Sequence, residues 1–187
     1  MKIPDSHPDI PKPKIGVLLV NLGTPDATDY FSMRRYLKEV LSDRRVIEIP
    51  KLIWSPILNL FILTFRPGKS GKLYKTIWDN KMDQSPLRVN TEKQAEELKK
   101  LTKKSNLKID WAMRYGKPSI PSKINELIKV GCTKLLVFPM YPQYSATTTA
   151  SVMDKVFETL IKLRWQPALR TVAPYFDEEI YIQSLVE

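Results

Sequence analysis

Tyrosine, arginine and hydroxyl side chains are the residues of this sequence with the clearest chemical potential. Tyrosine supplies a flat apolar ring with a polar tip, and arginine supplies a planar fork that pairs with carboxylates or stacks on aromatic rings. Together they suit a large, flat aromatic ligand with acidic substituents. Tyrosines packed at a domain edge, with Arg114 capping a helix, explain the same residues equally well. The group comprises Tyr74, Arg114, Tyr115, Tyr141, Tyr144 and Ser145.

Several other chemistries lack the residues that they need. The sequence has no Gly-x-Gly-x-x-Gly fingerprint, no P-loop and no Gly-x-Ser-x-Gly elbow, which argues against nucleotide binding and serine-hydrolase chemistry. The only histidine, His7, lies in a Pro- and Lys-rich segment, where we expect a solvated loop residue. A single cysteine, Cys132, excludes an internal disulfide, a cysteine-based zinc site and a self-contained iron–sulfur cluster, and it favours a reducing compartment.

The composition is that of an ordinary globular protein with a strong positive charge. Of 187 residues, 43% are hydrophobic and 27% are charged, which excludes collagen-like and broadly disordered chains. Lys and Arg number 30 and Asp and Glu 20, so the formal charge is +10. An anionic membrane surface, a polyanionic small molecule and lysines that merely solvate helix faces all agree with this charge. The common nucleic-acid-binding motifs do not occur, so we expect no nucleic-acid partner.

Apolar runs and helical periodicities alternate along the chain and predict the framework that positions these side chains. Runs such as Ile15–Val20 (IGVLLV) are typical of strands buried on both faces of a parallel sheet. The alternation predicts an α/β, Rossmann-like domain, with a parallel four-stranded sheet and helices on both faces. Ligands of such sheets bind beyond the carboxyl ends of the strands. The predicted strands cover residues 15–20, 107–115, 134–140 and 167–173, and their carboxyl ends carry residues 21–25, 113–115, 140–145 and 173–175.

Local signals predict where the helices begin and end. The pattern Thr91-x-x-Gln94 is a capping box, which predicts a helix start at Thr91 with Leu101 facing inward. Gly131 suits the C′ position of a helix that begins near Pro121. Asp177 is expected to cap the last helix. Further helices are predicted at residues 28–41, 71–78 and 149–164, and the last of these is expected to bury Val152, Val156, Phe157, Leu160 and Ile161.

The segment Lys51–Phe65 (KLIWSPILNLFILTF) is apolar on almost all sides. It is short for a transmembrane helix, and Pro56 interrupts it. A buried helix, an exposed apolar lip and an interfacial membrane contact are the alternatives. The basic cluster that follows favours a lip that touches lipid or an apolar ligand. This cluster consists of Arg66, Lys69, Lys72 and Lys75.

Short motifs recur in a fixed order along nearly the whole chain. They are VNLGTP at residues 20–25, SPL at 85–87, MRYGKP at 113–118 and YPQYSATTTAS at 141–151. In order and spacing they resemble the motifs of the ferrochelatase family. The resemblance implies a lyase that inserts Fe²⁺ into protoporphyrin IX to form protohaem, the last step of haem biosynthesis. It further implies two similar Rossmann-like halves with the porphyrin cleft between them. This chain would comprise an arm at residues 1–13, the first half at 14–174 and the start of a linking helix at 175–187.

The same resemblance implies porphyrin-binding roles for individual residues. Leu22 would lie against the macrocycle, and residues 51–69 would form a lip on which Arg66 and Lys69 face the propionates. Tyr74 would line the cleft and Ser85 would contact the porphyrin. Arg114 and Tyr115 would lie on the inner wall, near the ring face at which the metal arrives. The floor of the pocket would consist of Tyr141, Tyr144 and Ser145.

Two departures from the family pattern bear on what this chain does by itself. Animal members carry a cluster-ligating cysteine where this chain has Ala146, so we expect no [2Fe–2S] cluster and no other cofactor. The family's histidine and its acidic partner would lie beyond Glu187. We therefore expect no catalytic residue in this chain, leave its metal-binding residues unknown, and expect the chain, as a truncated form, to be inactive. A non-catalytic porphyrin-binding half-domain and another Rossmann-like anion-binding module are the alternatives.

The expected partners follow from this interpretation. They are the porphyrin and ferrous iron, together with the chain's own C-terminal half or a second copy of the chain. We expect a cytoplasmic protein, peripheral to the inner membrane if residues 51–65 touch lipid.

Overall fold

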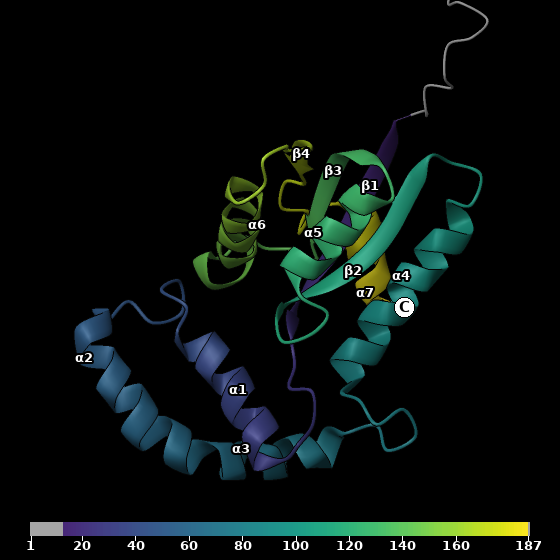
Figure 1. Ribbon diagram of the computed structural model, residues 1–187. Coiled ribbons are helices and arrows are strands. Elements are labelled where there is room, and N and C mark those ends of the chain that lie inside the picture. Colours follow the sequence, from purple (N-terminus) through teal and green to yellow (C-terminus); the bar gives the residue numbers. More distant parts are fainter. Residues whose placement is uncertain (1–12, 187) are drawn as a thin grey trace, which may run out of the picture.

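Four parallel strands form the centre of the structure, a computed structural model that describes residues 13–186 (Figure 1). Strand β1 (Lys14–Gly23) is central, and the order is β2-β1-β3-β4. Its neighbours are β2 (Leu107–Tyr115) and β3 (Cys132–Pro139), and β4 (Ala168–Thr171) pairs with β3. The predicted four-stranded parallel sheet is confirmed. The predicted N-terminal arm up to residue 12, with His7, lies outside the described residues.

Alternation along the strands divides the apolar side chains between the two faces of the sheet. Leu18 and Val20 point to one face, where α5 (Ile120–Lys129) and α6 (Ser151–Ile161) cover them. Val17 and Leu19 point to the other face, which α4 (Pro86–Leu101) covers over β1 and β2. Helices therefore lie on both faces, as predicted.

A third apolar cluster lies beyond the carboxyl ends of the strands. It joins α1 (Tyr30–Leu41) to the long helical segment that follows it (Figure 1). Helix α1 begins at Asp29, whose carboxylate accepts hydrogen bonds from the backbone N–H groups of Phe31 and Ser32. Met33 and Leu37 of α1 are buried in this cluster. The cluster includes Tyr115 and so packs α1 and the helical segment against the end of β2.

The apolar segment predicted at residues 51–65 is helical and largely exposed. It comprises α2 (Lys51–Pro56), the π-helical turn η1 (Ile57–Ile62) and the first residues of α3 (Leu63–Ile77), which follow one another in an arc (Figure 1). Leu58 and Leu63 are buried, whereas Leu52 is 91% exposed and Leu60, Phe61 and Phe65 are exposed as well. The buried-helix alternative is therefore wrong for most of the segment, and an exposed lip describes it.

Two predicted helix boundaries and several predicted buried residues are wrong. Helix α4 begins at Pro86 because the Ser85 hydroxyl accepts from the backbone N–H of Arg88, so Thr91 lies inside the helix instead of capping it. Leu101, predicted to face inward, is 84% exposed, because it ends a helix that has already passed the sheet. The helix predicted from Thr149 begins as the π-helical turn η2 (Ala146–Ala150), and α6 ends at Ile161. Phe157 and Ile161 of α6 are exposed, not buried.

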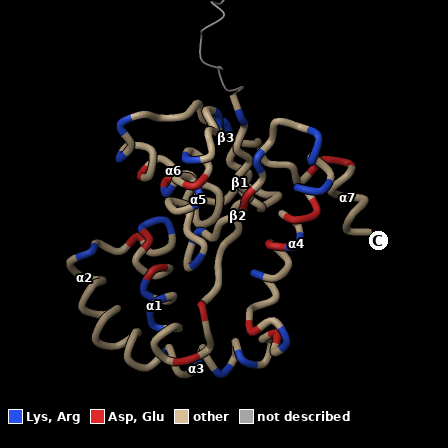
Figure 2. The backbone as a smooth tube through the Cα atoms, turned by 45° about the vertical axis from the view of Figure 1, so that its right-hand side comes forward, with Lys and Arg blue, Asp and Glu red and all other residues tan. Residues whose placement is uncertain are grey.

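The last described helix, α7 (Glu179–Val186), begins two residues after its predicted cap, Asp177, and has no buried residue. Within residues 13–186, none of the helices is long and apolar enough to cross a membrane. Lys and Arg are spread over most of the described elements (Figure 2).

Candidate functional site

Two glycine turns bring the ends of β1 and β2 together at the carboxyl edge of the sheet. Gly23 is the last residue of β1 and has φ +111°, and Gly116 follows β2 with φ +85°. Both values lie in the region that residues with a Cβ rarely adopt. A Cβ at Gly23 would overlap the carbonyl oxygen of Tyr115, and one at Gly116 would lie 2.6 Å from the carbonyl oxygen of Thr24. Glycine at these positions lets the two strand ends approach each other.

A buried network of polar side chains lies at this edge, centred on the carboxylate of Asp43 just after α1. Its Oδ2 accepts hydrogen bonds from Nη2 of Arg114 (2.5 Å), Oγ of Ser151 (2.5 Å) and the hydroxyl of Tyr115 (2.8 Å). Arg114 also donates from Nε to the carbonyl oxygen and to Oγ of Ser151, at 2.8 and 2.6 Å. Its guanidinium lies 4.4 Å from the centre of the Tyr115 ring. The side chains of Asp43 and Arg114 are each 8% exposed.

The network determines the protonation states of its members. Burial raises the pKa of Asp43, but hydrogen bonds from Ser151, from the Arg45 backbone and from Tyr115, with the charge of Arg114, outweigh it and leave the pKa below its usual range. Burial also raises the pKa of Tyr115 to about 12. At neutral pH Asp43 is therefore an anion paired with Arg114, and Tyr115 is a neutral phenol whose proton points to Asp43.

Arg114 and Tyr115 are thus close together, as predicted, but neither presents a free group to solvent. Arg114 is 9% exposed and Tyr115 is fully buried in the described chain. The guanidinium of Arg114 bonds the carbonyl oxygen of Ser151, the first residue of α6, so this contact ties β2 to α6 and is not the helix cap that the alternative for Arg114 describes. The polar side-chain groups of Arg114 and Tyr115 bond Asp43 and Ser151 inside the network.

Leu22 and Tyr74 both adjoin the apolar cluster beyond the strand ends. Both are partly buried and pack against the cluster formed by α1 and α3. The rings of Tyr74 and Tyr36 contact edge to face, with centroids 6.2 Å apart, and the Tyr36 hydroxyl donates to the carbonyl oxygen of Gly23 (3.2 Å). This aromatic pair therefore adjoins the glycine turn after β1.

The predicted floor residues lie after β3, at the same sheet edge. Tyr141 is partly buried, and within the described chain its hydroxyl is buried without a hydrogen-bond partner. Burial raises its pKa, so the phenol stays neutral. Tyr144 is 61% exposed, and the Ser145 hydroxyl caps η2 by accepting from the backbone N–H of Thr147 (3.3 Å). Tyr141 and Tyr144 thus present one buried phenol and one exposed aromatic ring.

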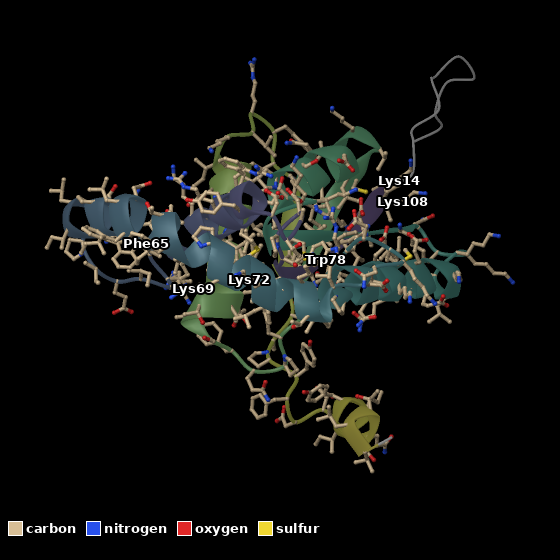
Figure 3. The ribbon with its side chains drawn as sticks, turned by 90° about the horizontal axis from the view of Figure 1, so that it is seen from below. Lys14, Phe65, Lys69, Lys72, Trp78 and Lys108 are labelled. Atoms are coloured by element: carbon tan, nitrogen blue, oxygen red, sulfur yellow. The ribbon has the colours of Figure 1, made fainter. Side chains whose placement is uncertain are left out.

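The remaining predicted residues lie on α3 and at the start of α4. Arg66 and Lys69 are exposed on α3, and Figure 3 shows Phe65, Lys69 and Lys72 along this helix. Ser85 is 2% exposed, and its hydroxyl is used as the cap of α4. Arg66 and Lys69 are therefore available to an anion, whereas Ser85 has a local structural role.

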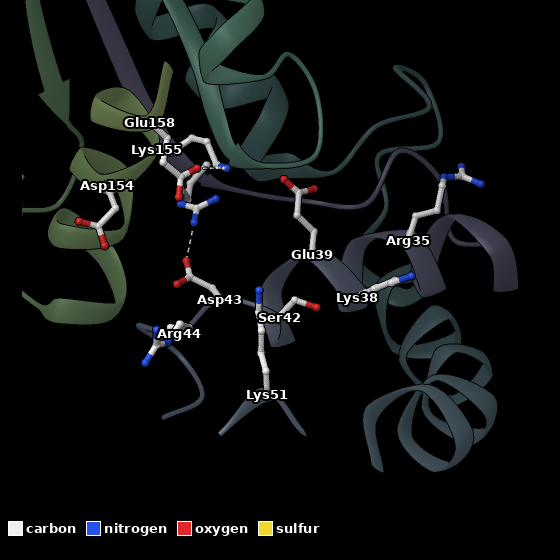
Figure 4. A pocket seen from close by; sticks show the side chains of 11 residues that line it. Arg35, Lys38, Glu39, Ser42, Asp43, Arg44, Lys51, Asp154, Lys155 and Glu158 are labelled. Atoms are coloured by element: carbon white, nitrogen blue, oxygen red, sulfur yellow. Dashed lines mark hydrogen bonds and ion pairs between the residues drawn. The ribbon is translucent and has the colours of Figure 1, made fainter. Parts of the chain in front are cut away.

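A cavity of about 600 Å³ opens beside the network, between α1 and α6 (Figure 4). Asp43 and Arg114 line it, and a second cavity of about 610 Å³ shares Lys38, Ser42 and Lys51 with it and extends along α2. The other charged residues that line the first cavity are Arg35, Lys38, Glu39, Arg44, Lys51, Asp154, Lys155 and Glu158. Within residues 13–186 no cluster of three or more His, Cys, Asp or Glu residues is arranged to hold a metal ion.

Sequence reasoning missed Asp43 and Ser151. Ser151 is the last residue of the predicted YPQYSATTTAS motif, but its spacing gives no hint of its partner. Asp43 lies in the segment LSDRR, which carries no pattern beyond the end of a helix. Asp43 and Ser151 acquire their role only in the folded chain. There Asp43 contacts Arg114, 71 positions away, and Ser151, 108 positions away.

Comparison with known proteins places the chain in a family. Residues 14–187 match the family model described as Ferrochelatase. A curated ferrochelatase of Allorhizobium ampelinum is 56% identical over 184 residues, which are 98% of this chain and 54% of that protein. One of Rhizobium etli is 57% identical over 185 residues, again 98% and 54%. One of Brucella ovis is 56% identical over 180 residues, which are 96% and 51%.

The chain spans about half the length of the curated relatives that it matches. The matched region begins at the first residue of β1 and includes every motif noted in the sequence. The parallel sheet with helices on both faces agrees with a chelatase-type α/β fold. The chain belongs to the ferrochelatase family.

Proposed function

We propose that the full-length protein containing this chain inserts Fe²⁺ into protoporphyrin IX to form protohaem, and that this chain supplies one wall of the porphyrin site. Membership of the ferrochelatase family carries this proposal. The structure supports it through the exposed apolar lip, which begins at Lys51 in the cavity that Asp43 and Arg114 also line and is followed on α3 by the exposed cations Arg66 and Lys69. A flat apolar ligand with carboxylates fits such a surface.

The proposed binding surface combines the predicted residues according to where they lie. Leu22 and Tyr74 supply apolar contacts for the macrocycle, and Arg66 and Lys69 on α3 face its propionates. Tyr141, Tyr144 and Ser145 form the floor, where the exposed ring of Tyr144 is the part that a ligand reaches and the Tyr141 hydroxyl is buried beneath the surface. Arg114 and Tyr115 form the wall behind the ring face, and Ser85 supports the surface by capping α4.

Metal insertion requires the porphyrin to lose two protons and to bend, and the wall must hold the ring while this happens. A free-base porphyrin carries two N–H protons in a planar ring, and both must leave as the metal sheds its water. Bending the ring exposes the nitrogen lone pairs, and contacts with the rest of the macrocycle must stabilise that strain. The role of this chain is to hold the ring and to orient it. We place the proton acceptor, a histidine with an acidic partner, in the part of the full-length protein beyond this chain.

We propose that the reaction uses no cofactor beyond its two substrates. Cys132, the only cysteine of the chain, is buried in the core at the start of β3, where burial raises the pKa of its thiol. A thiol in that place is poorly suited to ligate a cluster. We further propose a cytoplasmic protein whose lip, residues 51–65, makes a peripheral contact with a membrane surface.

Formation of zinc protoporphyrin, followed by its fluorescence, tests the function. Full-length protein is expected to turn over at a rate on the order of 1 per second. Residues 1–187 alone are expected to quench the fluorescence of added protoporphyrin by binding it, but to insert no metal. Turnover by the isolated chain would contradict the assignment of the proton acceptor. Absence of turnover by the full-length protein would contradict the proposed function, and would leave the non-catalytic porphyrin-binding half-domain.

A further inference from the structure

Asp43 joins its own loop to two distant parts of the chain, the end of β2 and the start of α6, through one carboxylate oxygen. The donors to its Oδ2 come from Arg114, Tyr115 and Ser151, which are 71, 72 and 108 positions away. All four residues are buried or nearly so. A carboxylate that accepts several short hydrogen bonds, one of them from a guanidinium, is held in one geometry and holds its donors likewise.

The same residue also holds the loop that leads to the lip. Oδ1 of Asp43 accepts from the backbone N–H of Arg45 (2.8 Å), and its carbonyl oxygen accepts from those of Val46 (3.0 Å) and Ile47 (2.9 Å). The guanidinium of Arg45 then donates to both carboxylate oxygens of Asp154 on α6, at 2.7 and 3.1 Å. The loop between α1 and α2 is therefore fastened to α6 at Asp43 and again at Arg45.

We propose that Asp43 is a positioning residue of this site. Its carboxylate holds the phenol of Tyr115 and the guanidinium of Arg114 at the end of β2, and through its loop it sets where α2 and the lip leave the domain. The wall behind the ring face and the lip around the ring are thereby coupled through one side chain. The inference rests on the proposed function for its kinetic consequences, but not for its structural ones.

Asp43→Asn in the full-length protein tests the proposal, with Asp110→Asn as the matched control. Asp110 pairs with Lys123 (3.2 Å), is 19% exposed, and lies on the same strand as Arg114, away from the site. A misplacement of about 1 Å can cost about a hundredfold in rate. We expect Asp43→Asn to lower kcat/KM for the metal tenfold or more, and Asp110→Asn to stay within about twofold of wild type. Equal effects of the two variants would overturn the proposal.

Hydrogen exchange gives a readout that does not depend on activity. In Asp43→Asn, amides of residues 42–62 are expected to exchange faster, while those of β1 keep the wild-type rate. Acceleration of both regions to the same degree would mean general destabilisation and would overturn the positioning role. Ser151→Ala, which removes only one of the donors, is expected to show the same pattern in weaker form and serves if Asp43→Asn does not fold.

A double variant tests the route of the effect. If Asp43 acts through Tyr115, the added loss from Tyr115→Phe in the Asp43→Asn background is expected to be much smaller than in wild type. Full additivity would contradict this route. A wild-type protein that inserts no metal would refute the proposed function, and the exchange pattern would still decide the positioning role.

Discussion

At the scale of single residues, the site depends on positions that tolerate only one type of side chain. The turns after β1 and β2 close only because Gly23 and Gly116 lack a side chain. Asp43 matters for the opposite reason, since its carboxylate satisfies several buried donors at once. Removing one partner of such a group leaves the others buried and unpaired, which costs more than the contact itself.

Gly23→Ala is therefore expected to be strongly destabilising. The backbone has φ +111° there, and the new Cβ would overlap the carbonyl oxygen of Tyr115. We expect a loss of about 2–4 kcal/mol in the free energy of unfolding, measured by urea denaturation. Gly68→Ala is the control, because a Cβ at this exposed helical position meets nothing within 4 Å. It is expected to raise stability by up to about 1 kcal/mol. Equal effects at the two glycines would refute the argument from the turn.

The charge of Asp43 makes part of the stability dependent on pH. Its pKa is lowered in the folded state, so its contribution is fully present above the unfolded value near 4 and is lost as pH falls through the folded value. At pH 7, Asp43→Asn is expected to lower the free energy of unfolding by about 3 kcal/mol. The difference from wild type should shrink steadily below about pH 4. Urea denaturation between pH 7 and pH 3 measures it, and a constant difference would contradict the prediction.

At the scale of elements, the sequence predicts well what depends on local pattern. Ile15–Val20 reads as a buried strand because every residue of it is apolar, and β1 contains it. Gly131 marks the end of α5 because its φ of +91° favours glycine. The true start of α4 is equally local, since Ser85 followed by Pro86 is a cap followed by a proline at the first helical position. Thr91 is a competing signal that tertiary packing overrides, because it is buried and its hydroxyl accepts from the side-chain amide of Asn21.

Pro56 in the lip and Pro67 just after it show what the local sequence pattern does not predict. Pro56 and Pro67 both lie inside helices, although proline usually interrupts them. Pro67 cannot donate to the carbonyl oxygen of Leu63, and the Tyr30 hydroxyl (3.0 Å) and Nε of Arg34 (3.2 Å) bond that oxygen instead. These donors come from α1, about 30 positions earlier, so the continuous arc depends on a contact that no periodicity reveals.

Exposed side chains of the lip are expected to affect membrane binding but not folding stability. Leu52→Ser with Phe61→Ser changes exposed side chains, so the melting temperature should stay within about 2 °C of wild type. The same variant should lose most of its binding to anionic lipid vesicles in a flotation assay, because the apolar contact is gone. Leu63→Ala, at a fully buried position, is expected to cost about 2–5 kcal/mol of stability. Unchanged vesicle binding by the double variant would refute the proposed membrane contact.

At the scale of the whole molecule, exposed apolar surface and positive charge act against each other. Most residues of helix α7 are exposed, with Ile180 and Val186 each 83% exposed, and Phe176 just before it is exposed too. Patches of this kind promote association. The formal charge of +10 repels like copies and keeps them apart. The balance between the two depends on ionic strength, since the range of the repulsion falls to about 8 Å at 0.15 M salt.

Residues 1–187 alone are therefore expected to self-associate reversibly, and more strongly as salt is raised. Sedimentation velocity over a range of protein concentrations at low and at physiological salt measures this. Ile180→Glu with Leu185→Glu removes exposed apolar surface from α7 and should shift the distribution toward monomer at every salt concentration. The lip variant Leu52→Ser with Phe61→Ser shows whether the other exposed apolar surface contributes instead. A wild-type chain that stays monomeric at high concentration and high salt would contradict the prediction. Association that weakens with salt would mean that charge pairing, rather than apolar contact, holds the copies together.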